Sequence, residues 1–358
     1  MPPRSGIFSN DSNDSNDSND SNDSNDSNSS GPSGLSAYAG KTLSTVLANA
    51  LWTTRGDLVR GTVGTGNAVM DQVRLGSEAA LGRWSPDVRA HMYAFELVSG
   101  VRFDAVSSDV ARLCLAGTES AEKASDVLVE LKRPGYDMNS SDLSKELELV
   151  LSMAALRGDR MNEMLTQVAW PISFFSMVLN LQPGRHRFTL ELMATALNFS
   201  TVAVMQFKHH FRVIRPSDRS PLVQPILLTP SHGAYPAGHA AQAHLLAMIL
   251  KTLVGKTLGD DLGGQLSGLA DRIGQNRVIA GVHYQTDIVE GKKLGEALGE
   301  YLTAKKPPAE VESNQSLSES ATPSNSGTPE SIPLSAVGWL WKKAQQEWPV
   351  AGRKNGKQ

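Results

Sequence analysis

Three short stretches of the chain place cations, histidines and one carboxylate where they can bind an anion and move a proton. In the first stretch, Lys208 and Arg215 are seven residues apart, nearly two helical turns, so we expect both on one face of a helix. Pro216 prevents that helix from continuing and leaves Arg215 in its last turn, beside a loop. Arg212, four residues after Lys208, is an alternative partner for the lysine. The pair of cations predicts one wall of an oxyanion site.

The second stretch, Tyr235-Pro236-Ala237-Gly238-His239, is a turn that leads directly into an apolar helix. Backbone N–H groups at such a helix start bind anions, helped by the helix dipole. Gly238 lets the chain approach a ligand closely. We expect His239 at the rim of this anion site, where an imidazole can exchange a proton with a ligand oxygen.

The third stretch runs from Arg277 to Asp287. Arg277 and His283 are six residues apart and would face different ways on an unbroken helix, so Gly281 is expected to break it. His283 and Asp287 are four residues apart, the spacing at which a carboxylate can hold an imidazole N–H and fix its tautomer. Alone, this stretch also fits a core histidine paired with a local acid. Together, the three stretches predict one catalytic site for an oxyanion.

Composition limits what surrounds this site. The 358 residues are 40% hydrophobic and 20% charged, which is enough for a sizeable core, and the net charge of -3 argues against nucleic-acid or membrane-surface binding. Cys114 is the single cysteine, so no intramolecular disulfide is possible and a cytoplasmic location is expected. The segment 164–184 carries no charged residue and is long enough to cross a bilayer. Its polar residues and Pro171 favour a buried helix broken at the proline, and no membrane span is predicted.

Apolar residues at helical spacing predict an all-α helical bundle over residues 35–304, with the motif core in 140–304. No segment alternates clearly enough to predict a strand. The principal helices are expected over residues 85–99, 121–132, 186–214, 240–253, 266–280 and 287–302, with one more beginning near 143.

Three segments are expected to lie outside this bundle. Residues 1–34 contain a Ser-Asn-Asp triplet repeated six times and predict a disordered tail. Residues 305–335, rich in Ser, Glu and Pro, predict a disordered linker. Residues 336–358 carry three tryptophans and predict a short helix that docks either on this body or on a partner.

The three stretches taken in order resemble the signature of one superfamily. It includes type-2 phosphatidic acid phosphatases, bacterial non-specific acid phosphatases and vanadium-dependent haloperoxidases. The resemblance covers the chain from Lys208 to Asp287 and implies the helix-bundle fold of that superfamily. Two positions depart from it, because Ala237 and Asn276 stand where its members usually have Ser. The missing hydroxyl at position 237 removes a hydrogen bond to a charged oxygen, a loss of roughly 1.5–3 kcal/mol.

As a phosphatase, the resemblance implies that the phosphoryl oxygens are bound by Lys208, Arg215, Arg277 and the Gly238 N–H. His283, oriented by Asp287, would form a phosphohistidine. His239 would protonate the leaving oxygen and then activate water. The first prediction is therefore a hydrolase for small-molecule phosphoric monoesters. It needs no cofactor and no divalent metal, because the cations take over the role of a metal.

Two alternatives stay open. In a haloperoxidase the same cage would hold vanadate as the cofactor, with His283 as the vanadium ligand. His232, seven residues before His239, falls where bromide-oxidising members also carry a histidine, and it is a candidate for a halide site or for a supporting role. A non-catalytic phosphate-binding protein is the second alternative, since Ala237 weakens the cage. The substrate and the oligomeric state are left undetermined.

Overall fold

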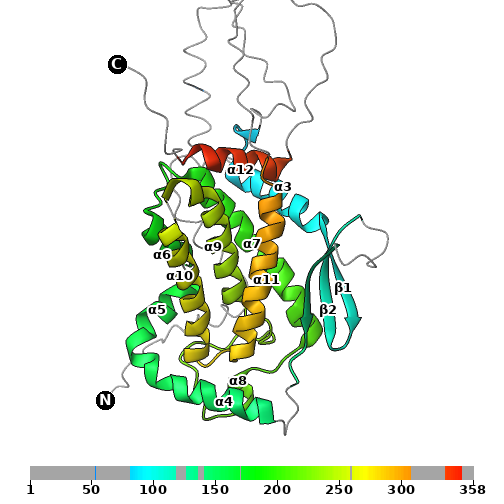
Figure 1. The fold of residues 1–358 in the computed structure, drawn as a ribbon, viewed down its shortest axis with the longest axis vertical. Coiled ribbons are helices and arrows are strands. Elements are labelled where there is room, and N and C mark those ends of the chain that lie inside the picture. Colours follow the sequence, from blue (N-terminus) through cyan, green and yellow to red (C-terminus); the bar gives the residue numbers. More distant parts are fainter. Residues whose placement is uncertain are drawn as a thin grey trace, which may run out of the picture.

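The computed structural model describes Thr53 and residues 81–117, 126–135, 141–169, 171–258, 260–307 and 335–348 (Figure 1). The predicted tail 1–34 and most of the predicted linker 305–335 lie outside these described residues. The described part is a bundle of helices with one small sheet at its side, so the prediction of a helical bundle is confirmed. Its elements are, in order, α3 (Pro86–Ser99), β1 (Val101–Ser107), β2 (Val110–Leu115), β3 (Val127–Lys132), α4 (Ser141–Met153), a 3-10 turn (Ala154–Leu156), α5 (Arg157–Ala169), α6 (Pro171–Leu179), α7 (Arg187–Phe211), α8 (Pro216–Arg219), α9 (Gly238–Leu258), α10 (Asp260–Ile279), α11 (Gln285–Ala304) and α12 (Ala336–Gln346).

Helix α9 is the centre of the bundle, and α7, α10 and α11 pack around it (Figure 1). Its apolar side chains are buried on every side, as expected for a helix that others enclose. Helix α11 comes unusually close, because a Cβ on Gly291 would lie only 2.5 Å from the carbonyl oxygen of Ala237. Glycine is therefore required where α11 crosses the start of α9. This close approach brings the beginnings of the two helices together.

The segment 101–132 differs from the prediction, because its described part forms three strands. β2 pairs antiparallel with β1 and with β3, and Leu113 lies opposite Phe103 on one side and Val129 on the other. The helix predicted over 121–132 is thus wrong for residues 127–132. In β3, only Val129 and Leu131 are buried between more exposed neighbours. An alternation this short cannot be told from a helix by pattern alone.

The apolar segment around Pro171 is divided as predicted. Helix α5 ends at Ala169, and α6 begins at Pro171. One described helical stretch, Arg187–Arg219, is long and apolar enough to cross a membrane, with a mean hydropathy of 1.4. However, 56% of that apolar window is buried inside the bundle, and a core helix meets the same criterion.

The tryptophan-rich segment packs on its own chain, one of the two alternatives left by the sequence. Helix α12 lies across α3 and the start of α7, at the end of the bundle away from α8 (Figure 1). Glu347 accepts hydrogen bonds from the N–H groups of Phe188 and Thr189, at 2.7 and 2.8 Å, and so caps α7. Trp348 adds an indole N–H to the hydroxyl of Thr189 at 3.1 Å. This segment therefore closes one end of the bundle.

Candidate active site

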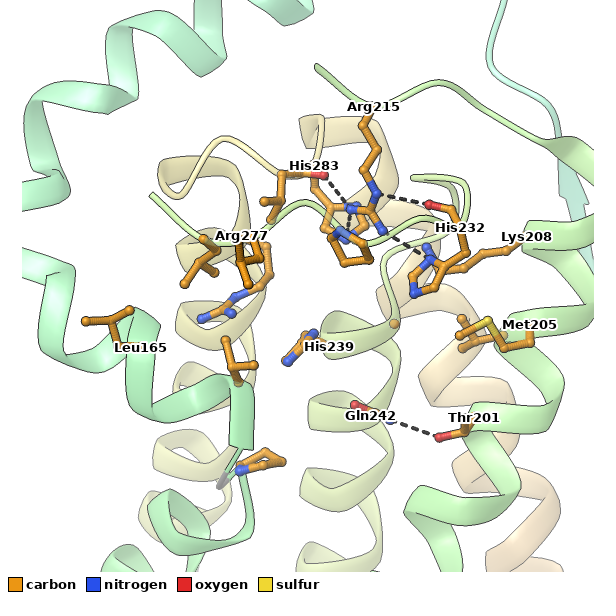
Figure 2. A pocket seen from close by; sticks show the side chains of 18 of the residues that line it. Leu165, Thr201, Met205, Lys208, Arg215, His232, His239, Gln242, Arg277 and His283 are labelled. Atoms are coloured by element: carbon orange, nitrogen blue, oxygen red, sulfur yellow. Dashed lines mark hydrogen bonds between the residues drawn. The ribbon is translucent and has the colours of Figure 1, made fainter. Parts of the chain in front are cut away.

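A cavity of about 410 Å³ lies at the end of the bundle opposite α12 (Figure 2). Its polar lining includes seven residues that the sequence singled out: Lys208, Arg215, His232, Gly238, His239, Arg277 and His283. The rest of the wall is largely apolar and comes mainly from α5, α7 and the loop before α9. The structure thus brings the three stretches together around one cavity.

Lys208 and Arg215 reach this cavity from different elements. Lys208 is buried in the last turn of α7, which ends at Phe211. Arg212 caps the helix in a left-handed conformation, with φ of 52°, and its side chain is exposed. The prediction that Arg215 lies in the same helix is wrong, since it stands after the helix and directly before α8. Arg215, and not Arg212, is the second cation of the cavity.

Both cations are held by backbone carbonyl groups. The Lys208 ammonium donates to the carbonyl oxygens of Gly233 and Ala234 at 2.7 and 2.8 Å. The Arg215 guanidinium donates to the carbonyl oxygens of His232 and Val282 at 3.0 and 2.8 Å. Burial, reinforced by Arg215, lowers the pKa of Lys208 well below its usual range. Crowded cations with neutral partners gain stabilisation when an anion binds among them.

Arg277 is the third cation, at the end of α10. It is 1% exposed, and its Nη2 donates to the carbonyl oxygen of Met164 at 3.0 Å and to Oε1 of Gln167 at 3.1 Å. Its Nε and Nη1 have no hydrogen-bond partner among the described residues. Burial lowers the pKa of Arg277 to about 10, so the side chain remains charged at neutral pH. A buried, charged guanidinium with two unsatisfied donor nitrogens is a strong donor for an oxyanion.

The start of α9 supplies backbone donors and one imidazole. The N–H of Ala237 donates to the carbonyl oxygen of Asp287 at 2.9 Å, which fixes the chain immediately before the helix. The N–H groups of the first helical turn, beginning at Gly238, have no intrahelical acceptors. His239 lines the cavity in the same turn (Figure 2). Burial, followed by the charges of Arg277 and Lys208, lowers the pKa of His239 to about 3.

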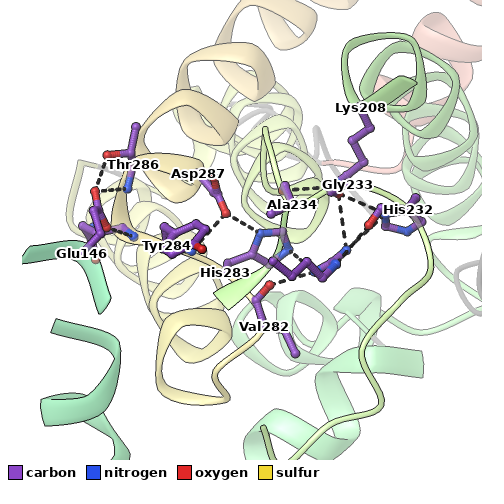
Figure 3. A network of polar contacts seen from close by, with 12 residues as sticks. Glu146, Lys208, His232, Gly233, Ala234, Val282, His283, Tyr284, Thr286 and Asp287 are labelled. Atoms are coloured by element: carbon purple, nitrogen blue, oxygen red, sulfur yellow. Dashed lines mark hydrogen bonds and ion pairs between the residues drawn. The ribbon is translucent and has the colours of Figure 1, made fainter. Parts of the chain in front are cut away.

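His283 and Asp287 form the predicted pair (Figure 3). Gly281, with φ of 85°, breaks the chain between α10 and α11 as expected. Asp287 Oδ2 then accepts from His283 Nδ1 at 3.1 Å and from the Tyr284 N–H at 3.0 Å. Burial raises the pKa of Asp287 to about 7, and burial together with Arg215 lowers that of His283 well below its usual range.

The position of the proton on the His283 ring decides which of its nitrogens can react. Because Nδ1 donates to Asp287, Nε2 carries a lone pair, and it lies 3.5 Å from Nη1 of Arg215. That nitrogen can attack or bind an electrophilic centre held among the cations.

His232 also reaches the cavity, although the sequence left its role open. Nη2 of Arg215 lies 3.1 Å from its Nδ1 (Figure 2). A guanidinium can only donate, whereas the carbonyl oxygen of Gly233, 3.3 Å from the same Nδ1, can only accept. We assign the ring proton to Nε2, because the contact of Nδ1 with Arg215 is the shorter of the two. Burial, then Lys208 and Arg215, lower the pKa of His232 to about 4. His232 is therefore a neutral N–H donor beside the oxyanion site.

Helix α5 contributes residues that sequence reasoning missed. Leu165 and Val168 line the cavity, and Gln167 contacts Arg277. Arg157, at the start of α5, donates to the carbonyl oxygens of Val223, Gln224 and Ile279 at 2.7 to 2.9 Å, and ties α5 to the loops of the site. No local pattern indicates these roles, because each depends on a contact with a segment at least 66 residues away.

Comparisons with known proteins give a consistent picture. No family model matches the chain. A vanadium-dependent bromoperoxidase of Ascophyllum nodosum is 31% identical over 94 residues, which is 20% of this chain and 17% of the bromoperoxidase. This chain thus matches less than a fifth of the length of that relative.

Two solved structures are similar at 18% identity and a TM-score of 0.38 each. One is a transmembrane PAP2-type phosphatidylglycerolphosphate phosphatase from Bacillus subtilis, with 47% of this chain and 87% of that chain covered. The other is a bacterial vanadium-dependent iodoperoxidase, with 48% and 51% covered. These structural likenesses are too distant to carry an argument of their own. The ordered motifs, their assembly around one cavity and the bromoperoxidase match together show that this chain resembles the superfamily of type-2 phosphatidic acid phosphatases and vanadium-dependent haloperoxidases.

Proposed function

We propose that the cavity is the active site of an enzyme that binds a tetrahedral oxyanion, and that the oxyanion is vanadate in a halide-oxidising peroxidase. The chemistry of the donors fits such a group. Three buried cations surround the cavity, and two nitrogens of Arg277 are without protein partners among the described residues. Lys208, Arg215, Arg277 and the Gly238 N–H would hold the oxygens, and Nε2 of His283 would bind the central atom. Vanadate, when bound, supplies the centre that activates peroxide for halide oxidation.

The position of His232 carries this choice over hydrolysis. Its neutral imidazole lines the cavity and is oriented by Arg215, so that an N–H is available next to the oxyanion site. A donor at this position can bind a halide or a peroxide oxygen. The 31% identity with a bromoperoxidase supports the same choice. His239, uncharged at neutral pH because burial and then the surrounding cations lower its pKa, is suited to accept a proton from peroxide.

Hydrolysis of a phosphoric monoester is the second candidate, because the same residues can perform it. Nε2 of His283 would attack phosphorus to form a phosphohistidine, and the ester oxygen would leave with a proton from His239. A phosphate dianion among the cations would raise the pKa of His239, so that the proton becomes available on binding. His239 would then take a proton from the water that releases phosphate.

One assay pair separates the two reactions. The full-length protein is incubated with vanadate, hydrogen peroxide, bromide and a bromination dye, and in parallel with p-nitrophenyl phosphate without vanadate. We expect dye bromination that requires vanadate, disappears in His283→Ala and falls in His232→Ala. His209→Ala is the matched control, since this histidine is exposed on α7 outside the cavity.

The opposite result is equally clear. Release of p-nitrophenol that disappears in His283→Ala and is inhibited by vanadate, without any bromination, would identify the protein as a phosphatase. Vanadate binding without either activity would leave the non-catalytic alternative.

A further inference from the structure

Arg277 differs from the other two cations in how it is held. It spans from α10 to α5, where its Nη2 contacts the backbone of Met164 and the side-chain amide oxygen of Gln167. The remaining two nitrogens, Nε and Nη1, have no partner among the described residues. The orientation of the guanidinium plane is therefore set from its Nη2 side alone. Of the two contacts of Nη2, the one with Gln167 is to a side chain and the one with Met164 is to the backbone.

Gln167 is itself fixed by a second amide. It is fully buried, and its Oε1 accepts from Nδ2 of Asn276 at 2.9 Å as well as from Arg277 at 3.1 Å. Oδ1 of Asn276 accepts in turn from Nη1 of Arg160 at 3.1 Å. These bonds determine which end of the Gln167 amide faces Arg277. Asn276, which replaces the Ser usual in the superfamily, thus supports Arg277 from the adjacent position on α10.

The carboxylate of this network, Glu163, is paired with Arg272 and not with Arg277. Glu163 accepts one hydrogen bond from Nδ2 of Asn276 at 3.1 Å, but it is paired with Arg272 through two contacts of 2.5 and 2.7 Å. Arg272 accordingly lowers the pKa of Glu163. The negative charge of Glu163 is therefore balanced at the surface by Arg272, and the side-chain contact of Arg277 remains neutral.

We propose that Gln167 is a positioning residue that aims Arg277 into the cavity while leaving the charge of Arg277 for the bound oxyanion. The inference rests on the proposed oxyanion binding and adds to it a determinant of affinity. A carboxylate at position 167 would accept the same two hydrogen bonds, but it would neutralise the guanidinium before the anion arrives. An amide orients the cation without this competition. In a buried site one extra negative charge within contact distance of Arg277 changes anion affinity by at least about tenfold.

Two substitutions separate orientation from charge. Gln167→Met keeps the volume and removes the acceptor, so Arg277 loses its side-chain contact. Gln167→Glu keeps the acceptor and adds a charge. Gln275→Met is the matched control, because Gln275 is on the same helix as Arg277 and bonds to Gln285 and Met153 without contacting Arg277. Vanadate affinity is measured by calorimetric titration of each full-length protein, and folding by its thermal transition.

We expect both position-167 variants to bind vanadate at least about tenfold more weakly than the wild type. Gln167→Glu should unfold at the same temperature as the wild type, and Gln275→Met should bind vanadate with the wild-type affinity. If Gln167 had a merely structural role, Gln167→Met would unfold at a lower temperature, and both variants would bind vanadate with the wild-type affinity. That result would overturn the inference. Failure of the wild type to bind vanadate or phosphate would instead overturn the proposed function, and the inference with it.

Discussion

Replacing Ala237 by serine should strengthen oxyanion binding, because it restores a hydroxyl that the second stretch of the motif lacks. Ala237 is fully buried and immediately precedes Gly238, which lines the cavity. Its N–H is bound to the carbonyl oxygen of Asp287 at 2.9 Å, so the backbone is already fixed before the substitution is made. The change adds a single oxygen to a rigid position. Its effect can therefore be estimated from one hydrogen bond.

Two opposing free energies decide the outcome. A hydroxyl that donates to a charged oxygen contributes roughly 1.5–3 kcal/mol, which corresponds to roughly 10- to 100-fold tighter binding. Without an anion, the same hydroxyl is buried without a partner, at a cost of about 1–3 kcal/mol in the free energy of unfolding. The serine variant should thus bind vanadate more tightly and, in the absence of vanadate, unfold more easily. The two effects have opposite signs and can be measured separately.

Calorimetric titration with vanadate gives the affinity, and urea unfolding without vanadate gives the stability. Ala240→Ser is the matched control, since Ala240 is equally buried three residues further along, in α9, but packs against glycines of α10 and α11 and does not line the cavity. The control should lose stability without gaining affinity. If Ala237→Ser gains no affinity over this control, position 237 does not face the bound anion and our interpretation of the second motif is wrong.

Three further predictions follow from the same geometry. Asp287→Asn keeps the shape of the side chain but removes the charge that orients His283, so turnover in the bromination assay should fall by roughly 10- to 100-fold while the thermal transition shifts little. The pKa of His239 is lowered to about 3 from an ordinary value near 6.5. Between these two pH values the unfolded state binds a proton at His239, whereas the native state does not. His239 therefore lowers stability increasingly as pH falls from about 6.5 to about 3, whereas the raised pKa of Asp287 acts in the opposite direction. Urea unfolding at several pH values should show a shallower acid loss for His239→Gln than for the wild type, and an equal loss would contradict the assigned burial. Glu347→Gln removes the charged cap of α7 and should cost about 1–2 kcal/mol in the free energy of unfolding. It should leave bromination unchanged, because its contact with α7 is about 30 Å along the helix from Lys208; a comparable loss of activity would show that the two ends are coupled.

Local sequence signals predicted the parts of this protein that depend on neighbouring residues. Pro171 divides an apolar segment into two helices, and Gly281 breaks the chain between α10 and α11. The four-residue spacing of His283 and Asp287 makes their hydrogen bond a local contact, and it forms as predicted. Each of these features is decided by backbone dihedral preferences or by helical periodicity, which a sequence states directly.

Other features depend on segments that are distant in the sequence. The three-stranded sheet was missed because each strand is short and is stabilised by pairing with its neighbours. Arg215 was placed in α7, but that helix ends at Phe211, earlier than Pro216 requires, and Arg215 follows it. The contact of Gln167 with Arg277 joins residues 110 positions apart, and nothing near either residue indicates it.

The sequence by itself determined the candidates for the site: three cations, three histidines and one carboxylate, within stretches whose order resembles a known signature. Only the tertiary structure decided how that site is charged and oriented. Packing of α5 against α10 supplies Gln167 and leaves two nitrogens of Arg277 without a protein acceptor among the described residues. Burial then lowers the pKa of His239, and Arg215 orients His232. Spacing can predict a set of side chains, but their desolvation and their partners arise only when distant helices pack together.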